Sequence, residues 1–161
     1  MADHKVIIAI DPSINHTGYA VYVNGELDTS GVIRTPDLPD PQRVAHVTQK
    51  VWSIAVKYPA VALVIEVPES FSYARSQRNG KALNQGSMQK LNWVIGGLYV
   101  LPSIWGNARP MYTVSPRQWK GKMDKKLSKM ITGVQSHDES DAILLGQWFC
   151  RIGKSLLEAQ W

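Results

Sequence analysis

Two short apolar segments, each carrying one acid at its end, constrain the fold of this chain most. Residues 6–10 are rich in β-branched side chains and are followed by Asp11-Pro12, which predicts a buried strand that ends at Asp11. Residues 61–67 form a second apolar run whose one polar member is Glu66. Such runs are typical of parallel strands covered on both faces. If the two strands are neighbours, Asp11 and Glu66 meet at one edge of a sheet.

The segments around these runs predict a mixed α/β arrangement. Residues 17–23 and 27–35 flank Asn24-Gly25, a dipeptide that tolerates the positive φ angles of a tight hairpin turn. Asp40 is expected to be the N-cap of a helix over residues 41–57, with Pro41 in its first turn. Further helices are expected over residues 81–100, 116–120, 125–131 and from 136, and a fifth strand over 111–114. This order, three antiparallel strands plus two parallel ones flanked by helices, is that of the RNase H-like fold, although other α/β folds share so coarse a string.

Length and composition favour a single domain over residues 1–161. The chain is 44% hydrophobic and has one cysteine, Cys150, so no intramolecular disulfide can form and a reducing cytoplasm is expected. No apolar run approaches the roughly 20 residues that span a bilayer, so no membrane association is expected.

The charge is distributed unevenly along the chain. Residues 1–70 hold five Lys or Arg against eight Asp or Glu, whereas residues 71–161 hold thirteen against five. Between Arg75 and Lys129 there are eleven basic residues and one acid, Asp124, and aromatic residues such as Trp119 are interleaved with them. This pattern favours a polyanion as partner, and the alternative is a solvated basic surface.

The acids suggest a metal site. Carboxylates that converge at a buried edge repel each other unless a cation lies between them. Asp138 and Asp141, three residues apart at the start of the last helix, share one helical face, whereas Ser136 and Glu139 match a capping box. Each acid also has a plain structural explanation, because Asp-Pro initiates turns, a strand-end Glu can be exposed, and first-turn acids are stabilised by the helix dipole.

The kind of metal follows from the donors. Oxygen ligands without a Cys or His cluster suit Mg²⁺ or Mn²⁺ rather than Zn²⁺, and two such ions can clamp the attacking and leaving oxygens of a phosphodiester.

Three short motifs in this order resemble the RuvC-type Holliday junction resolvases of the RNase H-like nuclease superfamily. They are Ile8-Ala9-Ile10-Asp11-Pro12-Ser13 with Thr17-Gly18-Tyr19, then Val64-Ile65-Glu66, and then His137-Asp138-Glu139-Ser140-Asp141-Ala142. The resemblance implies that Asp11, Glu66, Asp138 and Asp141 bind two catalytic Mg²⁺ ions. It also implies a homodimer that cuts four-way DNA junctions in recombination and repair, with His137 supporting the site.

The resemblance also suggests residues that contact DNA. Ser13 replaces the family's glycine, and Pro68-Glu69 displaces the aromatic that follows the Glu, so either Phe71 or Tyr73 is a candidate wedge between bases, or else a loop anchor. Lys120 and one of Lys125 or Lys126 are expected at the scissile phosphate. Other cations are expected to neutralise the DNA backbone: Lys122, Arg75 and Arg78.

Three other functions remain open. The nearest is a nuclease for flaps, forks or other branched DNA. An ATPase of the actin and sugar-kinase type shares the fold but needs two such domains and a second glycine-rich phosphate loop. A catalytically inactive DNA-binding member would not need all four acids. The sequence names neither a helicase partner nor a preferred cleavage sequence.

Overall fold

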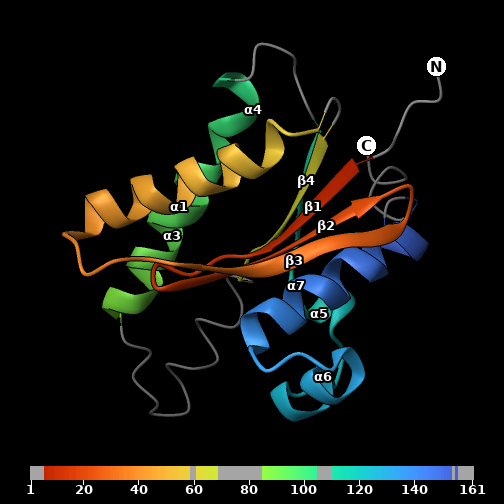
Figure 1. The fold of residues 1–161 in the computed structure, drawn as a ribbon. Helices are drawn as coiled ribbons and strands as arrows, with labels where there is room; N and C mark the ends of the chain where they lie inside the picture. The colour runs from red at the N-terminus through yellow and green to blue at the C-terminus, as the bar shows by residue number, and fades with distance from the viewer. Residues whose placement is uncertain (1–5, 59–60, 69–84, 105–109, 154, 156–161) are drawn as a thin grey trace.

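A five-stranded mixed sheet forms the centre of the molecule, which a computed structural model describes for residues 6–58, 61–68, 85–104, 110–153 and 155 (Figure 1). The strand order is β3-β2-β1-β4-β5. The β1–β2 and β2–β3 pairs are antiparallel, and the β1–β4 and β4–β5 pairs are parallel, so the predicted sheet is confirmed. The strands are β1 (Val6–Asp11), β2 (His16–Val23), β3 (Glu26–Arg34), β4 (Val61–Glu66) and β5 (Met111–Val114).

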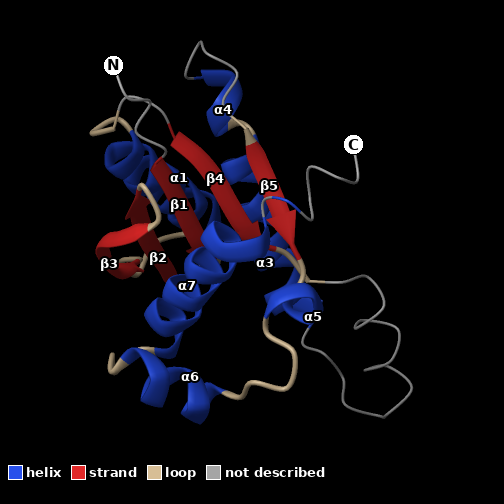
Figure 2. Cartoon of the chain, turned by 90° about the vertical axis from the view of Figure 1, so that its right-hand side faces the viewer, coloured by secondary structure: helices blue, strands red, loops and turns tan. Residues whose placement is uncertain are grey.

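Helices cover the sheet on both faces (Figures 1 and 2). One face carries α1 (Asp40–Ala55), α3 (Gln85–Tyr99) and the short α4 (Leu101–Ile104). The other carries α7 (His137–Trp148), which packs on β1, β2 and β3, while α6 (Lys125–Thr132) packs on α7. The short α5 (Pro116–Trp119) follows β5, and a π-helical turn, Phe149–Gly153, follows α7. Within the described ranges, no helix is long and apolar enough to cross a membrane.

The alternation of side chains along the central strands decides which face the two strand-end acids occupy. Ile8 and Ile10 of β1 belong to the core under α1 and α3, whereas Ala9 packs with α7. On β4, Ile65 belongs to the α1 and α3 side and Val64 to the α7 side. Because strand side chains alternate with a period of two, the residues that follow, Asp11 and Glu66, fall on the α7 side.

Turn chemistry was predicted well, and one helix cap was not. Asn24 and Gly25 have φ angles of 55° and 88°, as the predicted hairpin turn requires. The prediction that Asp40 is an N-cap is wrong, because Pro39 occupies that position and Asp40 is the first helical residue. The Asp40 carboxylate pairs with Arg43 and with Lys90 of α3 instead of capping the helix.

Helix boundaries differ by a few residues from those expected. α1 ends at Ala55 rather than at residue 57, and its C-cap is Val56. The helix expected over residues 81–100 is described from Gln85 to Tyr99, and residues 81–84 lie outside the described part of the chain. The start of α7 agrees with the prediction, because Ser136 is the N-cap and His137 is the first helical residue.

Candidate active site

The ends of β1 and β4 place two acids side by side at one edge of the sheet. The two strands pair in parallel, with Ile10 opposite Ile65, so Asp11 and Glu66 occupy the next step of the same register. Burial raises the pKa of Asp11 well above its usual range, and the charges of Glu66, Asp141 and Asp138 raise it further, while Lys120 opposes the shift. The four acids named from the sequence therefore lie within electrostatic reach of one carboxyl group.

The start of α7 brings in the other two acids. The Ser136 hydroxyl accepts a hydrogen bond from the backbone N–H of Glu139 and so caps the helix. Asp141 is buried, with 4% of its surface exposed, and Asp138 is half-buried, with His137 Nε2 3.0 Å from its Oδ1. His137, for which the sequence suggested a supporting role, thus contacts one of the four acids.

A glycine on β2 lets α7 come this close to the sheet. Gly18 pairs with Asp11 across the β1–β2 ladder. A Cβ atom added at Gly18 would lie 1.9 Å from the backbone oxygen of Asp138, so no other residue fits without moving the helix. The Thr-Gly part of the first motif thus sets the distance between β1 and the first turn of α7.

Trp119 of α5 fixes the orientation of Glu66. Its indole Nε1 donates a hydrogen bond to Glu66 Oε2 at 2.7 Å, and the ring is buried. Burial raises the pKa of Glu66, an effect that the Trp119 hydrogen bond and the charge of Lys120 partly offset. The indole donor therefore favours the ionised carboxylate, which is the form that binds cations.

Lys120 brings a cation into contact with the acids. Its Nζ contacts Asp141 Oδ2, and both side chains are mostly buried. The other carboxylate oxygen of Asp141, Oδ1, is buried and has no hydrogen-bond partner among the described residues. A buried anionic oxygen without a donor is costly, and a cation would satisfy it.

The donor atoms suit a hard divalent cation, but the described side chains are not arranged around a common point where one could bind. Among the described residues, no three His, Cys, Asp or Glu side chains are close enough to share a metal ion. The sheet edge nevertheless offers carboxylate oxygens from three elements, mutual repulsion at Asp11, and the unpartnered oxygen of Asp141. The residues present thus suit Mg²⁺ in kind and charge.

The role assigned to Glu139 is corrected in part. One half of the predicted capping box is present, the bond from the Glu139 N–H to the Ser136 hydroxyl. The carboxylate, however, accepts a hydrogen bond from Ser30 Oγ of β3 at 2.8 Å. Glu139 thereby ties α7 to the sheet, because its side chain points towards β3.

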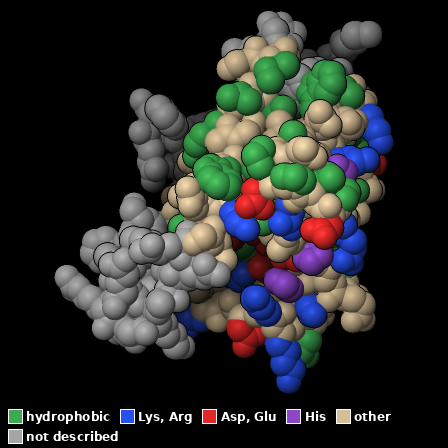
Figure 3. Space-filling view, turned by 90° about the vertical axis from the view of Figure 1, so that its left-hand side faces the viewer, with side chains coloured by type: hydrophobic (Ala, Val, Ile, Leu, Met, Phe, Trp, Pro, Cys, Tyr) green, Lys and Arg blue, Asp and Glu red, His purple; other side chains and the backbone are tan. Residues whose placement is uncertain are grey.

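The remaining predicted DNA contacts divide into two groups. Lys122, Lys125 and Lys126 are exposed on α6 and on the turn before it, where Asp124 caps the helix by accepting from the Leu127 N–H. In Figure 3, acidic side chains lie in a hollow rimmed by Lys, Arg and His side chains. Four further candidates lie outside the described residues: Phe71, Tyr73, Arg75 and Arg78.

Two residues of the site were not assigned a role from the sequence. In the sequence, Trp119 was noted only as an aromatic within the basic segment and as the neighbour of Lys120. Nothing in the neighbouring sequence predicts the hydrogen bond that its side chain makes to Glu66. Gly18 belongs to a quoted motif, but its steric role requires knowing that α7 crosses β2 at this point.

Comparisons with known proteins support the fold. No protein-family model matches the sequence, and no curated protein matches it. Among solved structures, Thermus thermophilus RuvC in complex with a Holliday junction substrate is similar, with a TM-score of 0.70 and 21% identity over 93% of this chain and 97% of that one. The yeast mitochondrial Holliday junction resolvase Ydc2 has a TM-score of 0.62 and 16% identity over 94% of this chain and 80% of that one. The chain therefore has the RNase H-like fold in the form found in RuvC-type resolvases.

Proposed function

We propose that this chain is a metal-dependent DNA endonuclease, one nuclease domain over residues 1–161, that resolves four-way junctions. The observation that carries the proposal is the grouping of acids at the edge where β1, β4 and α7 meet, with Asp11 raised in pKa by burial and by three other carboxylates. An edge that gathers four acids without enough neutralising cations costs free energy, and this cost is recovered if the edge binds divalent metal ions. The similarity in fold to two Holliday junction resolvases supports the choice of substrate.

The proposed metal ligands are Asp11, Glu66, Asp138 and Asp141. When bound there, two Mg²⁺ ions, for which Mn²⁺ can substitute, would activate a water molecule and neutralise charge on the departing 3′ oxygen. The protein holds Glu66 ready through Trp119 and holds Asp138 and Asp141 at a fixed spacing through the capped start of α7. In this proposal the carboxylates are metal ligands and therefore ionised, so they do not serve as proton donors.

Lys120 has two tasks in this proposal. Its ammonium group neutralises Asp141, and the same group lies close enough to Asp11 and Glu66 to affect their pKa values. The positive charge of Lys120 also attracts a phosphate group that enters the edge, and so favours binding of the strand beside the acids.

The exposed cations on and before α6 extend this attraction. Lys122, Lys125 and Lys126 are exposed, and in this proposal Lys122 neutralises backbone phosphate while one of Lys125 and Lys126 joins Lys120 at the scissile phosphate. Binding should therefore weaken steeply between about 50 and 200 mM salt. The four cationic and aromatic residues between 71 and 78 remain proposed contacts on the basis of the sequence alone.

A four-way junction has two symmetric strands to cut, and a two-fold dimer would present one active site to each. We therefore propose a homodimer. Large hydrophobic side chains that a second copy could cover are exposed on α1 and its C-cap, on α3, on α4 and at the residue that joins α3 to α4: Trp52, Val56, Trp93, Tyr99, Val100 and Ile104. Hydrophobic side chains gather in the upper part of the face in Figure 3. No partner helicase is proposed.

A panel of branched DNA substrates tests the function. The purified protein should nick a synthetic four-way junction in Mg²⁺ and, more slowly, flaps and forks, while Asp11→Asn should bind the junction without cutting it. Equal rates on junction and plain duplex would reject the resolvase assignment and leave a general nuclease. Equal rates on junctions, flaps and forks would favour the second candidate, a broader branched-DNA nuclease.

A further inference from the structure

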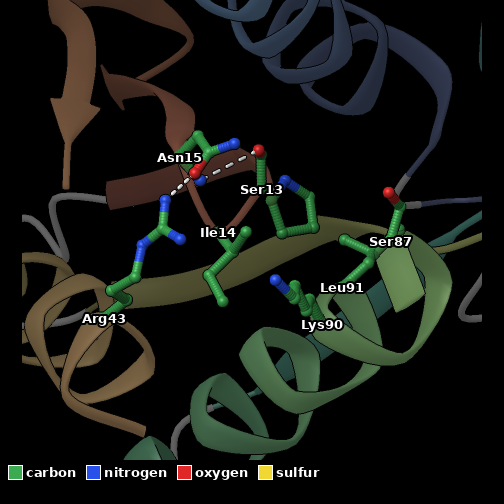
Figure 4. Close-up of a pocket in the computed structure, with 8 residues that line it drawn as sticks. Ser13, Ile14, Asn15, Arg43, Ser87, Lys90 and Leu91 are labelled. Carbon is green, nitrogen blue, oxygen red and sulfur yellow. Dashed lines mark hydrogen bonds between the residues drawn. The ribbon is translucent and has the colours of Figure 1, made fainter. Parts of the chain in front are cut away.

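A second site lies on the other side of the turn that follows Asp11. A pocket of about 300 Å³ is bounded by this turn, by α1 and by the beginning of α3. Figure 4 shows its side chains approaching one space from these three elements. The lining residues are Pro12, Ser13, Ile14, Asn15, Arg43, Ser87, Lys90 and Leu91. None of them belongs to the four acids or to the cations proposed to contact DNA near them.

The pocket carries an excess of positive charge. Lys90 Nζ lies 3.1 Å from one Asp40 oxygen, and Arg43 Nη1 lies 3.4 Å from the other. One carboxylate is thus shared by two cations, so one positive charge is left without a paired anion among these three groups. One carboxylate neutralises only one of the two positive charges, so a second anion bound between Arg43 and Lys90 would neutralise the other.

The Arg43 guanidinium also retains hydrogen-bonding capacity. Its Nη2 donates to Asn15 Oδ1, whereas its Nε is buried and has no acceptor among the described residues. A buried donor without an acceptor costs free energy, so the Arg43 side chain is not fully satisfied by its neighbours among the described residues. Ser13 and Ser87 also line the pocket, and the Ser13 hydroxyl accepts hydrogen bonds from the backbone N–H groups of Asn15 and His16. Phosphate oxygens accept hydrogen bonds from guanidinium and ammonium groups alike.

We propose that this pocket binds a backbone phosphate of the DNA strand that lies across the active site. The proposal rests on the proposed nuclease function and adds a phosphate-binding position to it. Pro12 and Ser13 follow Asp11 directly, so a phosphate held here is tied through two residues of backbone to a metal-binding carboxylate. Arg43 and Lys90 then position the strand relative to the acids, and they do not take part in the chemistry.

Salt-dependent DNA binding is the decisive measurement, because each neutralised phosphate adds a fixed amount to the slope of log K against log salt. Arg43→Gln and Lys90→Gln are made in the Asp11→Asn background, so that a fluorescent four-way junction is bound without being cut. Each variant should weaken binding and reduce the slope by about 0.9, the amount expected for one phosphate that is no longer neutralised. The control is Lys50→Gln, which removes the same charge from an exposed position on α1 outside the pocket and should keep its slope within about 0.3.

A purely structural role for the two cations predicts a different result. If they serve only to join α1 to α3 through Asp40, both variants lower the melting temperature while the salt slope stays at the parent value. That result would overturn the proposal. Thermal unfolding of each variant, measured alongside, shows whether a loss of binding occurs in a folded protein, and Lys90→Gln, at a half-exposed position, keeps the test valid if Arg43→Gln unfolds.

Inorganic phosphate is the other source of the same chemistry. If phosphate raises the melting temperature of the parent but not of Lys90→Gln, and the DNA salt slope is unchanged, the site takes a free anion and the DNA assignment is rejected. Failure of the proposed function looks different, because the parent would then neither bind nor cut the junction preferentially. In that case the same slopes measured on duplex and single-stranded DNA decide whether the pocket holds a backbone phosphate.

Discussion

Replacing Gly18 by alanine should separate α7 from the sheet edge at the point where the acids meet. The added Cβ would lie 1.9 Å from the Asp138 backbone oxygen and 2.3 Å from its carbonyl carbon. Ordinary van der Waals contacts begin at 3.4 Å, so the two backbones must move apart by about 1.5 Å. Neither can yield easily, because Gly18 is held in the β1–β2–β3 ladder and Asp138 lies in the first turn of a capped helix.

This displacement predicts two measurable losses. Overpacking of this kind costs about 1–3 kcal/mol in free energy of unfolding, which chemical denaturation followed by circular dichroism measures. A shift of about 1 Å or more in Asp138 and Asp141 relative to Asp11 should also lower the single-turnover cleavage rate by about 100-fold, because the two groups of ligands come from separate elements. The loss of rate should persist at temperatures well below the melting transition, where the variant is fully folded.

The matched control is Gly96→Ala. Gly96 lies on the exposed side of α3, and a Cβ added there meets nothing within 4 Å. Alanine favours a helix by about 1 kcal/mol over glycine, so this variant should be as stable as the parent or more stable and should cut at the parent rate. If Gly18→Ala matched Gly96→Ala in both stability and rate, the close approach of α7 to β2 would not be what aligns the acids.

Three further predictions concern single side chains. Asp11→Asn should raise the melting temperature in metal-free buffer at neutral pH, by about 2–4 °C per kcal/mol of repulsion relieved. Because the folded state raises the Asp11 pKa, the stability of the parent should fall as pH increases from the ordinary Asp pKa through that raised pKa. If the difference in stability between parent and Asp11→Asn did not change over this pH range, the reasoning would be contradicted. Trp119→Phe should lower the cleavage rate about 10-fold and raise the Mg²⁺ concentration for half-maximal rate. Val100→Glu should shift a dimer to monomer in light scattering, and Leu27→Glu, equally exposed on β3, should not.

The sheet could be predicted because its sequence signals are local. Apolar runs, the Asn24-Gly25 turn and the break at Asp11-Pro12 each act over a few residues, and all five strands appear where these signals place them. The face occupied by Asp11 and Glu66 also follows from local alternation once their strands are known to be parallel neighbours. Their meeting at one edge is therefore a consequence of secondary structure and topology alone.

The partners of the acids could not be predicted, because they depend on the path of the chain between β5 and α7. Residues 115–136 include two short helices, and the position of Trp119 and Lys120 depends on how α5 leaves the sheet. A Trp within a basic segment suggests stacking on bases as readily as a hydrogen bond to a buried Glu. Only the three-dimensional arrangement assigns its N–H to Glu66 and the Lys120 ammonium to Asp141.

Asp40 and Glu139 show why the capping predictions were less successful. Both acids stand at helix starts, where the sequence gives each a sufficient local role. In the structure, their carboxylates reach other elements instead, Asp40 to Lys90 of α3 and Glu139 to Ser30 of β3. A carboxylate at a helix start can accept hydrogen bonds from the backbone N–H groups of the first turn. A charged donor or a hydroxyl on a neighbouring element competes with these N–H groups for the carboxylate. The sequence does not show which neighbouring element is close enough to do so.

The edge that follows Asp11 therefore has opposite charge on its two sides. Among the described residues, four carboxylates lie near Lys120 on the α7 side, whereas two cations share the carboxylate of Asp40 on the α1 and α3 side. A strand crossing this edge would meet a site that requires cations and a site that requires an anion, separated by the turn at Pro12. A DNA strand that brings one phosphate with its metal ions to the acids and a second phosphate to the pocket would satisfy both requirements at once, and neither a free metal ion nor a free phosphate does so alone. The two halves of the edge should accordingly be coupled, with Mg²⁺ raising the affinity for DNA and DNA raising the affinity for Mg²⁺ by the same factor.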